Sequence, residues 1–169
     1  MPEERSIREH GYAANSPLTD GEPVYAFLAK SGVFAFDLDG KQLWQADVGT
    51  RTSGWGSAAS PIRCGELIII NASVESESLI ALDRQTGKEK WRAGGIRESW
   101  NTPILVPVGE KVELVLAIGG KVLGFDPTTG APLWSCATDI PWYMVPSLMA
   151  GGQLFLRADK TLFCIGAAK

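Results

Sequence analysis

Hydrophobic positions along the chain fall in short runs, and turn-forming residues break these runs every eight to ten positions. Residues 66–72 (ELIIINA) and 78–83 (SLIALD) are β-branched or apolar runs, and residues 88–93 (KEKWRA) alternate between polar and apolar. Such runs predict β-strands, and no segment sustains the period of a helix. With a further strand near residues 57–63, the pattern predicts four short strands in this stretch and an all-β fold.

One phrase occurs three times, as AFDLDGKQLW (35–44), ALDRQTGKEKW (81–91) and GFDPTTGAPLW (124–134). Each copy has an aspartate, a glycine three or four residues later, and a tryptophan four residues after the glycine. The tryptophans are separated by 47 and then 43 residues. The shared positions are Asp37, Gly40, Trp44, Asp83, Gly87, Trp91, Asp126, Gly130 and Trp134.

Prolines form a second series with the same period, at spacings of 44, 42 and 43 residues: Pro17, Pro61, Pro103 and Pro146. This series has four members, which indicates four repeats. Four strands per repeat of 40–45 residues is typical of a β-propeller blade. We therefore expect an N-terminal segment at 1–15, followed by blades at about 16–49, 57–93, 101–135 and 144–169.

The repeated phrase has a physical explanation as a tight hairpin between the third and fourth strands of a blade. The aspartate side chain can accept backbone N–H bonds across the turn, and glycine can take the left-handed conformation. The tryptophan then lies on the fourth strand. We expect its ring to fill the wedge between neighbouring blades rather than to contact a ligand.

The repeat resembles the tryptophan-docking repeat of quinoprotein-type (PQQ-like) β-propellers, over roughly residues 16–166. That family includes the dehydrogenases that use pyrroloquinoline quinone (PQQ), and the propeller is similar to that of the outer-membrane barrel-assembly lipoprotein. The resemblance implies rings of eight blades, so four repeats would be half a ring. It also implies a family that is often periplasmic or extracellular, and the repeated Asp, Gly and Trp positions carry over as structural residues.

The chain departs from the dehydrogenases of that family. In them, calcium and the quinone lie over the ring centre beside a disulfide between adjacent cysteines, and this chain has no adjacent pair. Its three cysteines are expected to be buried thiols: Cys64, Cys136 and Cys164. We therefore assign no cofactor, no metal and no catalytic residue.

The fourth repeat supplies a second strand at 152–159 and a third at 160–166, and the chain ends before a fourth. A half ring would expose apolar blade faces. The N-terminal segment could donate the missing outer strand, either within a small closed ring or, as we favour, in a homodimer of four plus four blades. An open half-propeller and a longer natural chain carrying the other blades are the alternatives.

Connections from the last strand of one blade to the first strand of the next carry the candidate site. They span residues 49–57, 94–101 and 136–144, and each has an aromatic residue before the next blade. These residues could form a ligand or partner surface, or they could fold inward and plug the ring centre. The candidate residues are Arg51, Trp55, Arg97, Glu98, Trp100, Trp142 and Tyr143.

Charge and composition exclude several classes of function. The net charge is −3 and no basic block is present, which argues against nucleic acid as a partner. No apolar run is long enough to span a membrane, and the first eleven residues do not look like a signal peptide. His10 is the only histidine, which argues against a Ser-His-Asp triad. Glu75 and Glu77 lie in an acidic loop that we expect to be solvated rather than to bind calcium.

The sequence therefore predicts a non-catalytic propeller module that binds or scaffolds a protein or ligand. A fragment of a quinoprotein oxidoreductase and a purely structural fragment remain the alternatives. The expected partners are a second copy of the chain, the remaining blades of a longer chain, or a peptide.

Overall fold

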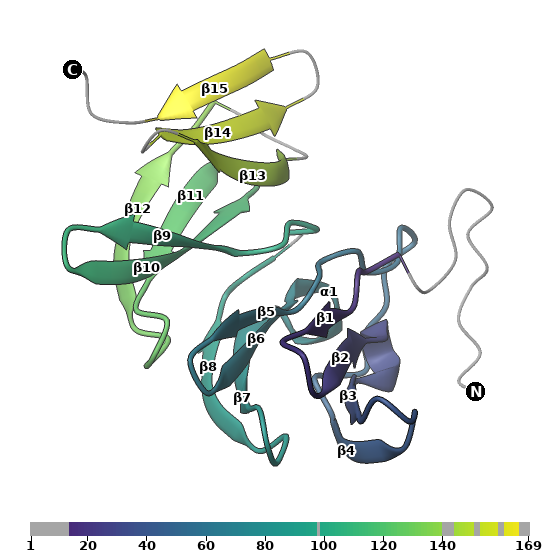
Figure 1. The fold of residues 1–169 in the computed structure, drawn as a ribbon. Helices are drawn as coiled ribbons and strands as arrows, with labels where there is room; N and C mark the ends of the chain where they lie inside the picture. The colour runs from purple at the N-terminus through teal and green to yellow at the C-terminus, as the bar shows by residue number, and fades with distance from the viewer. Residues whose placement is uncertain (1–13, 98, 140–143, 151–152, 159–160, 166–169) are drawn as a thin grey trace.

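A computed structural model describes residues 14–97, 99–139, 144–150, 153–158 and 161–165. Its strands form four antiparallel sheets, three with four strands and one with three. Strands adjacent in the sequence are adjacent in each sheet. The sheets succeed one another in chain order (Figure 1), as the blades of a propeller do. The expectation of an all-β, propeller-type fold is confirmed.

The first sheet contains β1 (Leu18–Thr19), β2 (Val24–Phe27), β3 (Val33–Phe36) and β4 (Gln42–Ala46). The second contains β5 (Ile62–Cys64), β6 (Leu67–Ala72), β7 (Ser78–Asp83) and β8 (Glu89–Gly94). The third contains β9 (Ile104–Val108), β10 (Lys111–Ile118), β11 (Lys121–Phe125) and β12 (Pro132–Ala137). The fourth contains β13 (Met144–Ala150), β14 (Gln153–Ala158) and β15 (Thr161–Ile165).

Two short helical turns join the second and third strands of the first two sheets. They are the 3-10 turn η1 (Ala29–Ser31) and the single α-helical turn α1 (Ser73–Ser76). The strand expected near residues 57–63 is shorter than predicted, because β5 covers only its last part. Ser60 lies before this strand and bonds to the neighbouring blade instead of to a strand of its own sheet.

The second sheet is buried on both faces. Ile68 and Ile70 of β6 pack in a cluster with residues of the first sheet, whereas Ile69 and Leu79 pack in a cluster with residues of the third. This follows from strand geometry, because successive side chains point to opposite faces. All four are inaccessible to solvent, and each stabilises the fold by about 1.5–3 kcal/mol through burial.

The repeated Asp-to-Gly turn is held by its aspartate side chain. In the second sheet Asp83 Oδ1 accepts bonds from the Thr86 backbone N–H (2.9 Å) and hydroxyl (2.8 Å), while the Gly87 N–H donates to the Asp83 carbonyl (2.8 Å). Gly87 has a φ of +70°, a conformation that glycine adopts at little cost. A bulge between Ala81 and Leu82 accompanies this turn.

Two of the repeated tryptophans lie between sheets. The Trp44 ring covers Gly87 of the next sheet so closely that a Cβ there would lie 2.6 Å from a ring carbon, and its Nε1 donates to the Arg84 carbonyl at 3.0 Å. Trp91 repeats this arrangement on Gly130, with a corresponding distance of 2.5 Å. Trp44 and Trp91 are each 9% exposed.

The third tryptophan lies in a different setting. Trp134 is 39% exposed, its ring lies against Gly124 of its own sheet, and its Nε1 donates to Glu113 at 2.6 Å. At the other end of the array, a Cβ added to Gly40 would have no atom within 4 Å. Among the described residues, therefore, no ring is stacked on the glycine of the Asp-to-Gly turn of the first sheet.

The proline series marks a chain of hydrogen bonds that runs from blade to blade. The Ser16 N–H donates to the Ser60 hydroxyl at 3.0 Å, and the Ser60 N–H donates to the Thr102 hydroxyl at 2.9 Å. These three residues each precede a proline. The hydroxyl before the proline therefore connects the second blade to the first and the third blade to the second.

One face of the first sheet differs from its counterpart in the second. The register of the strands makes Val24, Ala26, Phe34 and Phe36 equivalent to residues 68, 70, 80 and 82. The second-sheet residues are at most 1% exposed, whereas all four first-sheet residues are only partly buried. Phe34 and Phe36 stack on each other with ring centroids 6.0 Å apart. This face, which we call the open face, carries apolar residues that no blade of the described chain covers.

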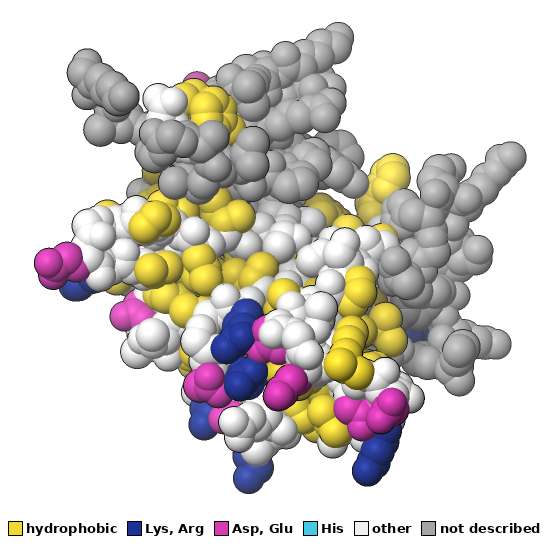
Figure 2. All heavy atoms as spheres, viewed as in Figure 1, with side chains coloured by type: hydrophobic (Ala, Val, Ile, Leu, Met, Phe, Trp, Pro, Cys, Tyr) yellow, Lys and Arg dark blue, Asp and Glu magenta, His cyan; other side chains and the backbone are white. Residues whose placement is uncertain are grey.

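Figure 2 shows positive and negative side chains interleaved where β5 to β8 lie, and hydrophobic side chains over β9 and β10. Arg63 and Arg84 both contact Asp20, at 2.5 and 2.7 Å. None of the helices in the described part of the chain is long and apolar enough to cross a membrane.

The expectation of buried thiols was wrong. Cys64 is partly exposed and Cys136 and Cys164 are exposed. For Cys136 the reason is that β12 is exposed along its whole length.

Candidate functional site

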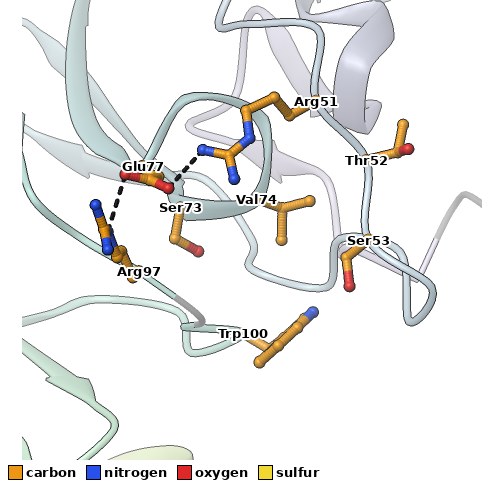
Figure 3. A pocket seen from close by; sticks show the side chains of 8 residues that line it. All are labelled: Arg51, Thr52, Ser53, Ser73, Val74, Glu77, Arg97 and Trp100. Carbon is orange, nitrogen blue, oxygen red and sulfur yellow. Dashed lines mark hydrogen bonds and ion pairs between the residues drawn. The ribbon is translucent and has the colours of Figure 1, made fainter.

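Three of the candidate residues come together at one end of the sheets (Figure 3). Arg51 lies in the connection that follows β4, whereas Arg97 and Trp100 lie in the connection that follows β8. Glu77 lies between them, in the hairpin that joins β6 to β7. The connections between blades and the hairpin between the second and third strands of a blade leave the sheets at the same end. Two connections that are distant in sequence therefore approach one hairpin.

Glu77 is the residue on which the two arginines converge. The Arg51 Nη1 lies 2.5 Å from Glu77 Oε1, and the Arg97 Nε lies 3.0 Å from Glu77 Oε2. The hydrogen bond from Arg51 lowers the pKa of Glu77, and the charge of Arg97 acts in the same direction. The carboxyl group is therefore ionised at neutral pH and carries two charge-assisted bonds.

The backbone holds Glu77 in an unusual conformation. Its φ is +53° and its ψ is +39°, in the left-handed region that residues with a Cβ rarely adopt. Its N–H donates to the Ser73 carbonyl at 3.2 Å, and its carbonyl accepts from the Ile96 N–H at 2.9 Å. These bonds tie the connection after β8 to the hairpin and offset the local strain.

These residues surround a pocket of about 350 Å³. Its lining is mostly polar, with a tryptophan ring and one valine as the apolar part. Figure 3 shows the two arginines on either side of Glu77 and the Trp100 ring across the pocket from them. The lining residues are Arg51, Thr52, Ser53, Ser73, Val74, Glu77, Arg97 and Trp100.

A buried polar network lies beneath the pocket. The Asn71 amide donates to the Ser99 carbonyl at 3.2 Å and to the Asn101 carbonyl at 2.8 Å, and the Ser73 hydroxyl also donates to the Ser99 carbonyl. The Asn101 amide donates in turn to the Ala117 carbonyl at 2.7 Å. Asn71, Ser73, Ser99 and Asn101 are each at most 3% exposed. Hydrogen bonds to buried groups hold the floor rigidly because breaking one leaves a desolvated polar atom.

The two described aromatic residues of the connections occupy different positions. The Trp100 indole is partly buried and donates to the Gly56 carbonyl of the preceding connection at 3.0 Å. Trp55 is 52% exposed and does not line the pocket. Both the partner surface and the inward plug remain predictions.

The remaining candidates, Glu98, Trp142 and Tyr143, lie outside the described residues. Sequence reasoning did not single out Thr52, Ser53, Ser73 or Val74 for this site. It placed Glu77 on the same loop face and weighed it for calcium, but did not include it among the candidate site residues. A small polar residue in a loop carries no periodic signal. The approach of the acidic hairpin to the two arginines depends on how neighbouring blades pack.

Contrary to the expectation from the sequence, the acidic hairpin is not simply solvated. Glu75 is 1% exposed, because α1 packs it inward, and Glu77 is engaged by two arginines. Among the described residues, no group of three or more His, Cys, Asp or Glu side chains could hold a metal ion. The pocket itself does not fit calcium, because the one carboxylate that lines it is already bound to two guanidinium groups.

Comparison with known proteins adds to this geometry. A family model described as outer membrane protein assembly factor BamB matches residues 6–97 and again residues 75–167. Outer membrane protein assembly factor BamB of Burkholderia pseudomallei (strain K96243) is 29% identical over 126 residues, which are 73% of this chain and 31% of that protein. The chain therefore spans about a third of the length of this curated relative.

Two solved structures show a similar fold. The crystal structure of BamB from Moraxella catarrhalis matches with a TM-score of 0.63 and 15% identity, over 85% of this chain and 40% of that one. Quinohemoprotein alcohol dehydrogenase from Comamonas testosteroni matches with a TM-score of 0.55 and 20% identity, over 73% of this chain and 21% of that one. At these identities the structural similarities bear on the fold alone.

Proposed function

The chain belongs to the family of the outer membrane protein assembly factor BamB, and from this premise we propose that it is a non-catalytic propeller module that binds or scaffolds another protein. The observation that carries the proposal is the pocket formed by Arg51, Glu77, Arg97 and Trp100 at the loop end of the sheets. Exposed aromatic and arginine side chains are enriched where proteins bind partners. Trp55 extends this surface in the same connection as Arg51.

The charges of the lining residues favour binding over acid–base chemistry. A guanidinium group stays protonated at neutral pH, and the pKa of Glu77 is lowered by its bond to Arg51. A general acid or base works best when its pKa lies near the operating pH. These lining groups are therefore suited to holding fixed charges toward a partner.

The name of the family suggests the class of partner, an outer membrane protein in an unfolded or partly folded state, and a site of action in the compartment where such proteins are assembled. Propeller blades suit this task because extended segments can bind at loop surfaces and at sheet edges. The proposal applies to the repeats present in this chain.

Binding of a urea-denatured outer membrane protein to the immobilised chain, followed by biolayer interferometry after dilution into buffer, tests the proposal. Trp55→Ala should weaken binding while the unfolding midpoint stays unchanged. Leu38→Ala is the matched control, because Leu38 is an exposed apolar residue (71%) in the Asp-to-Gly turn at the opposite end of the sheets. Equal binding by both variants and the parent would refute a role for this surface. A large loss of stability in Trp55→Ala alone would identify that residue as structural.

A fragment of a quinoprotein oxidoreductase is the second candidate, since the chain shares its fold with a quinohemoprotein alcohol dehydrogenase. It would require quinone bound with calcium, and the described pocket does not fit calcium. The discriminating experiment adds PQQ and calcium, removes free ligand and records the absorbance of the protein. A retained quinone chromophore would support the enzyme, whereas its loss on desalting would support the binding module.

We also propose that the chain self-associates as a homodimer that completes a ring. Support comes from the open face, where Val24, Ala26, Phe34 and Phe36 occupy positions that are fully buried in the second sheet. A second copy would cover this face and shield Phe34 and Phe36 from water. The segment 1–15, predicted to donate an outer strand, lies largely outside the described residues.

Light scattering after size exclusion measures the mass directly. The parent chain should have the mass of two copies, and both Phe36→Asp and removal of residues 1–10 should shift it toward one. Leu133→Asp is the control, because Leu133 is half exposed on β12 of the third sheet. A monomer at all concentrations would refute the dimer and favour either a solitary half-propeller or blades supplied by a longer chain.

A further inference from the structure

The pocket has more positive than negative charge, and its two guanidinium groups keep hydrogen-bond donors that Glu77 does not engage. Arg51 and Arg97 contribute two guanidinium groups, and Glu77 is the one carboxylate among the lining residues. Arg51 bonds to Glu77 through Nη1 and Arg97 through Nε. Within the described residues, the other guanidinium N–H groups of the two arginines have no hydrogen-bond partner. Each guanidinium group therefore keeps donors for a further acceptor.

Glu77 shows which chemical group this arrangement accepts. Two arginines from two separate connections reach one carboxylate, with N–O distances of 2.5 and 3.0 Å. The carboxylate is held there by a left-handed backbone conformation, which is strained for a residue with a Cβ. Strain of this kind persists where the surroundings fix it, and it is concentrated at functional sites.

The rest of the lining fits the side chain of a short acidic residue. The Ser53 hydroxyl oxygen accepts a bond from the Trp55 backbone N–H at 3.3 Å, which leaves the hydroxyl hydrogen for a ligand oxygen. Val74 and the Trp100 ring supply an apolar wall that could contact the methylene groups of an aspartate or glutamate. A volume of about 350 Å³ admits a few side chains of an extended peptide.

The charged groups of the lining come from the two connections and the hairpin, and α1 contributes none. Arg51 and Arg97 lie in the two connections and Glu77 in the hairpin, while Glu75 of α1 is buried and does not line the pocket. The lining residues carry one net positive charge, which one additional carboxylate would neutralise. A group with two negative charges would exceed this balance.

We propose that this pocket binds the carboxylate of an acidic residue in an extended peptide, with Arg51 and Arg97 as the recognising groups and Glu77 as the internal carboxylate that orients them. This inference rests on the proposed protein-binding function and names the chemistry of its ligand. Glu77 also limits affinity, because it neutralises half of the positive charge of the arginines.

The test compares two short capped peptides, one with glutamate between two phenylalanines and one with glutamine in its place, by isothermal titration calorimetry at low salt. We expect the glutamate peptide to bind at least about ten-fold more tightly, since hydrogen bonds to charged groups contribute more than neutral ones. Arg97→Gln should abolish this preference without unfolding the chain, because the Arg97 side chain is 75% exposed.

Two further variants separate recognition from structure. Glu77→Gln should strengthen binding of the glutamate peptide several-fold because it releases both arginines, whereas a purely structural role would lower stability and leave affinity unchanged. Arg63→Gln is the matched control: it also removes an ion-paired arginine, but one that pairs with Asp20 at the other end of the sheets.

The outcomes distinguish this inference from the function beneath it. Equal binding of the two peptides, with loss of both in Trp55→Ala, would overturn carboxylate recognition and leave the binding module intact. A phosphoserine peptide that binds more tightly than the glutamate peptide would also overturn it. Failure of both peptides to bind at concentrations approaching the solubility limit, together with failure of the denatured outer membrane protein to bind, would overturn both proposals.

Discussion

Gly87 and Gly40 occupy equivalent turns, yet only one of them lies beneath a tryptophan ring. Both have a positive φ, +70° and +82°. A Cβ on Gly87 would lie 2.6 Å from the Trp44 ring, whereas a Cβ on Gly40 would have no atom within 4 Å. Substituting alanine at each position therefore separates the cost of the backbone conformation from the cost of the contact between blades.

The expected magnitudes differ by a factor of about three. Alanine in the left-handed region costs about 1 kcal/mol, and this applies equally to both substitutions. Gly87→Ala adds about 1–3 kcal/mol of overpacking, because the Trp44 ring must shift. The shift also weakens its bond to the Arg84 carbonyl. We expect a loss of about 1 kcal/mol for Gly40→Ala and about 3 kcal/mol for Gly87→Ala.

Urea unfolding followed by circular dichroism measures both free energies, provided that the dependence on urea stays constant among the variants. Repeating Gly87→Ala in a Trp44→Ala background completes a double-mutant cycle, and the cost there should fall to about 1 kcal/mol. If Gly40→Ala and Gly87→Ala destabilise the chain equally, the contact between ring and turn contributes nothing and the reasoning is refuted.

Three other predictions use the same unfolding measurements. A hydrogen bond from the Thr86 hydroxyl lowers the pKa of Asp83 from 3.8 to about 2. The resulting stabilisation is complete above the higher of these pH values and is lost as the pH falls toward the lower one. Asp83→Asn should therefore make the free energy of unfolding fall less steeply at acid pH, and an unchanged slope would contradict this. Asn71→Ala should cost about 1–3 kcal/mol, because it leaves the buried Asn101 carbonyl without its donor while the Ser99 carbonyl keeps the Ser73 hydroxyl; a cost well under about 1 kcal/mol would mean that water replaces the amide. Trp134→Ala should cost about 1 kcal/mol and Trp91→Ala about 4 kcal/mol, since the Trp134 ring is 39% exposed and the Trp91 ring only 9%; similar costs would show that exposure does not measure the contribution of the ring.

Periodicity predicted the strands because each strand has its own local signal. In the second repeat, the predicted 78–83 coincides with β7 (Ser78–Asp83), and the predicted 88–93 differs from β8 (Glu89–Gly94) by one residue. The strand predicted near residues 57–63 begins only at Ile62, because Ser60 before it bonds to the neighbouring blade. Local propensity cannot report a partner about 40 residues away.

The candidate site was less accessible to sequence reasoning. The repeated connections drew attention to Arg51, Arg97 and Trp100, because the repeat shows where loops recur at the same end of a sheet. That Glu77 would meet both arginines, and that Glu75 would be buried, depends on the approach of a hairpin to two connections. Two acidic residues separated by one position carry no signal that distinguishes an inward from an outward side chain.

The hydrogen bonds to the hydroxyl groups before the prolines all run in one direction along the array of blades, so the two ends of the array are not equivalent. Ser16 donates its N–H to Ser60, and Ser60 donates to Thr102, so every bond points the same way along the array. A blade added before the first needs only a backbone N–H to reach the Ser16 hydroxyl, which any sequence other than proline provides. A blade after the third continues this series of bonds only if it brings its own hydroxyl, and the fourth repeat has Val145 at that position. Extension of the series is therefore undemanding at one end and selective at the other.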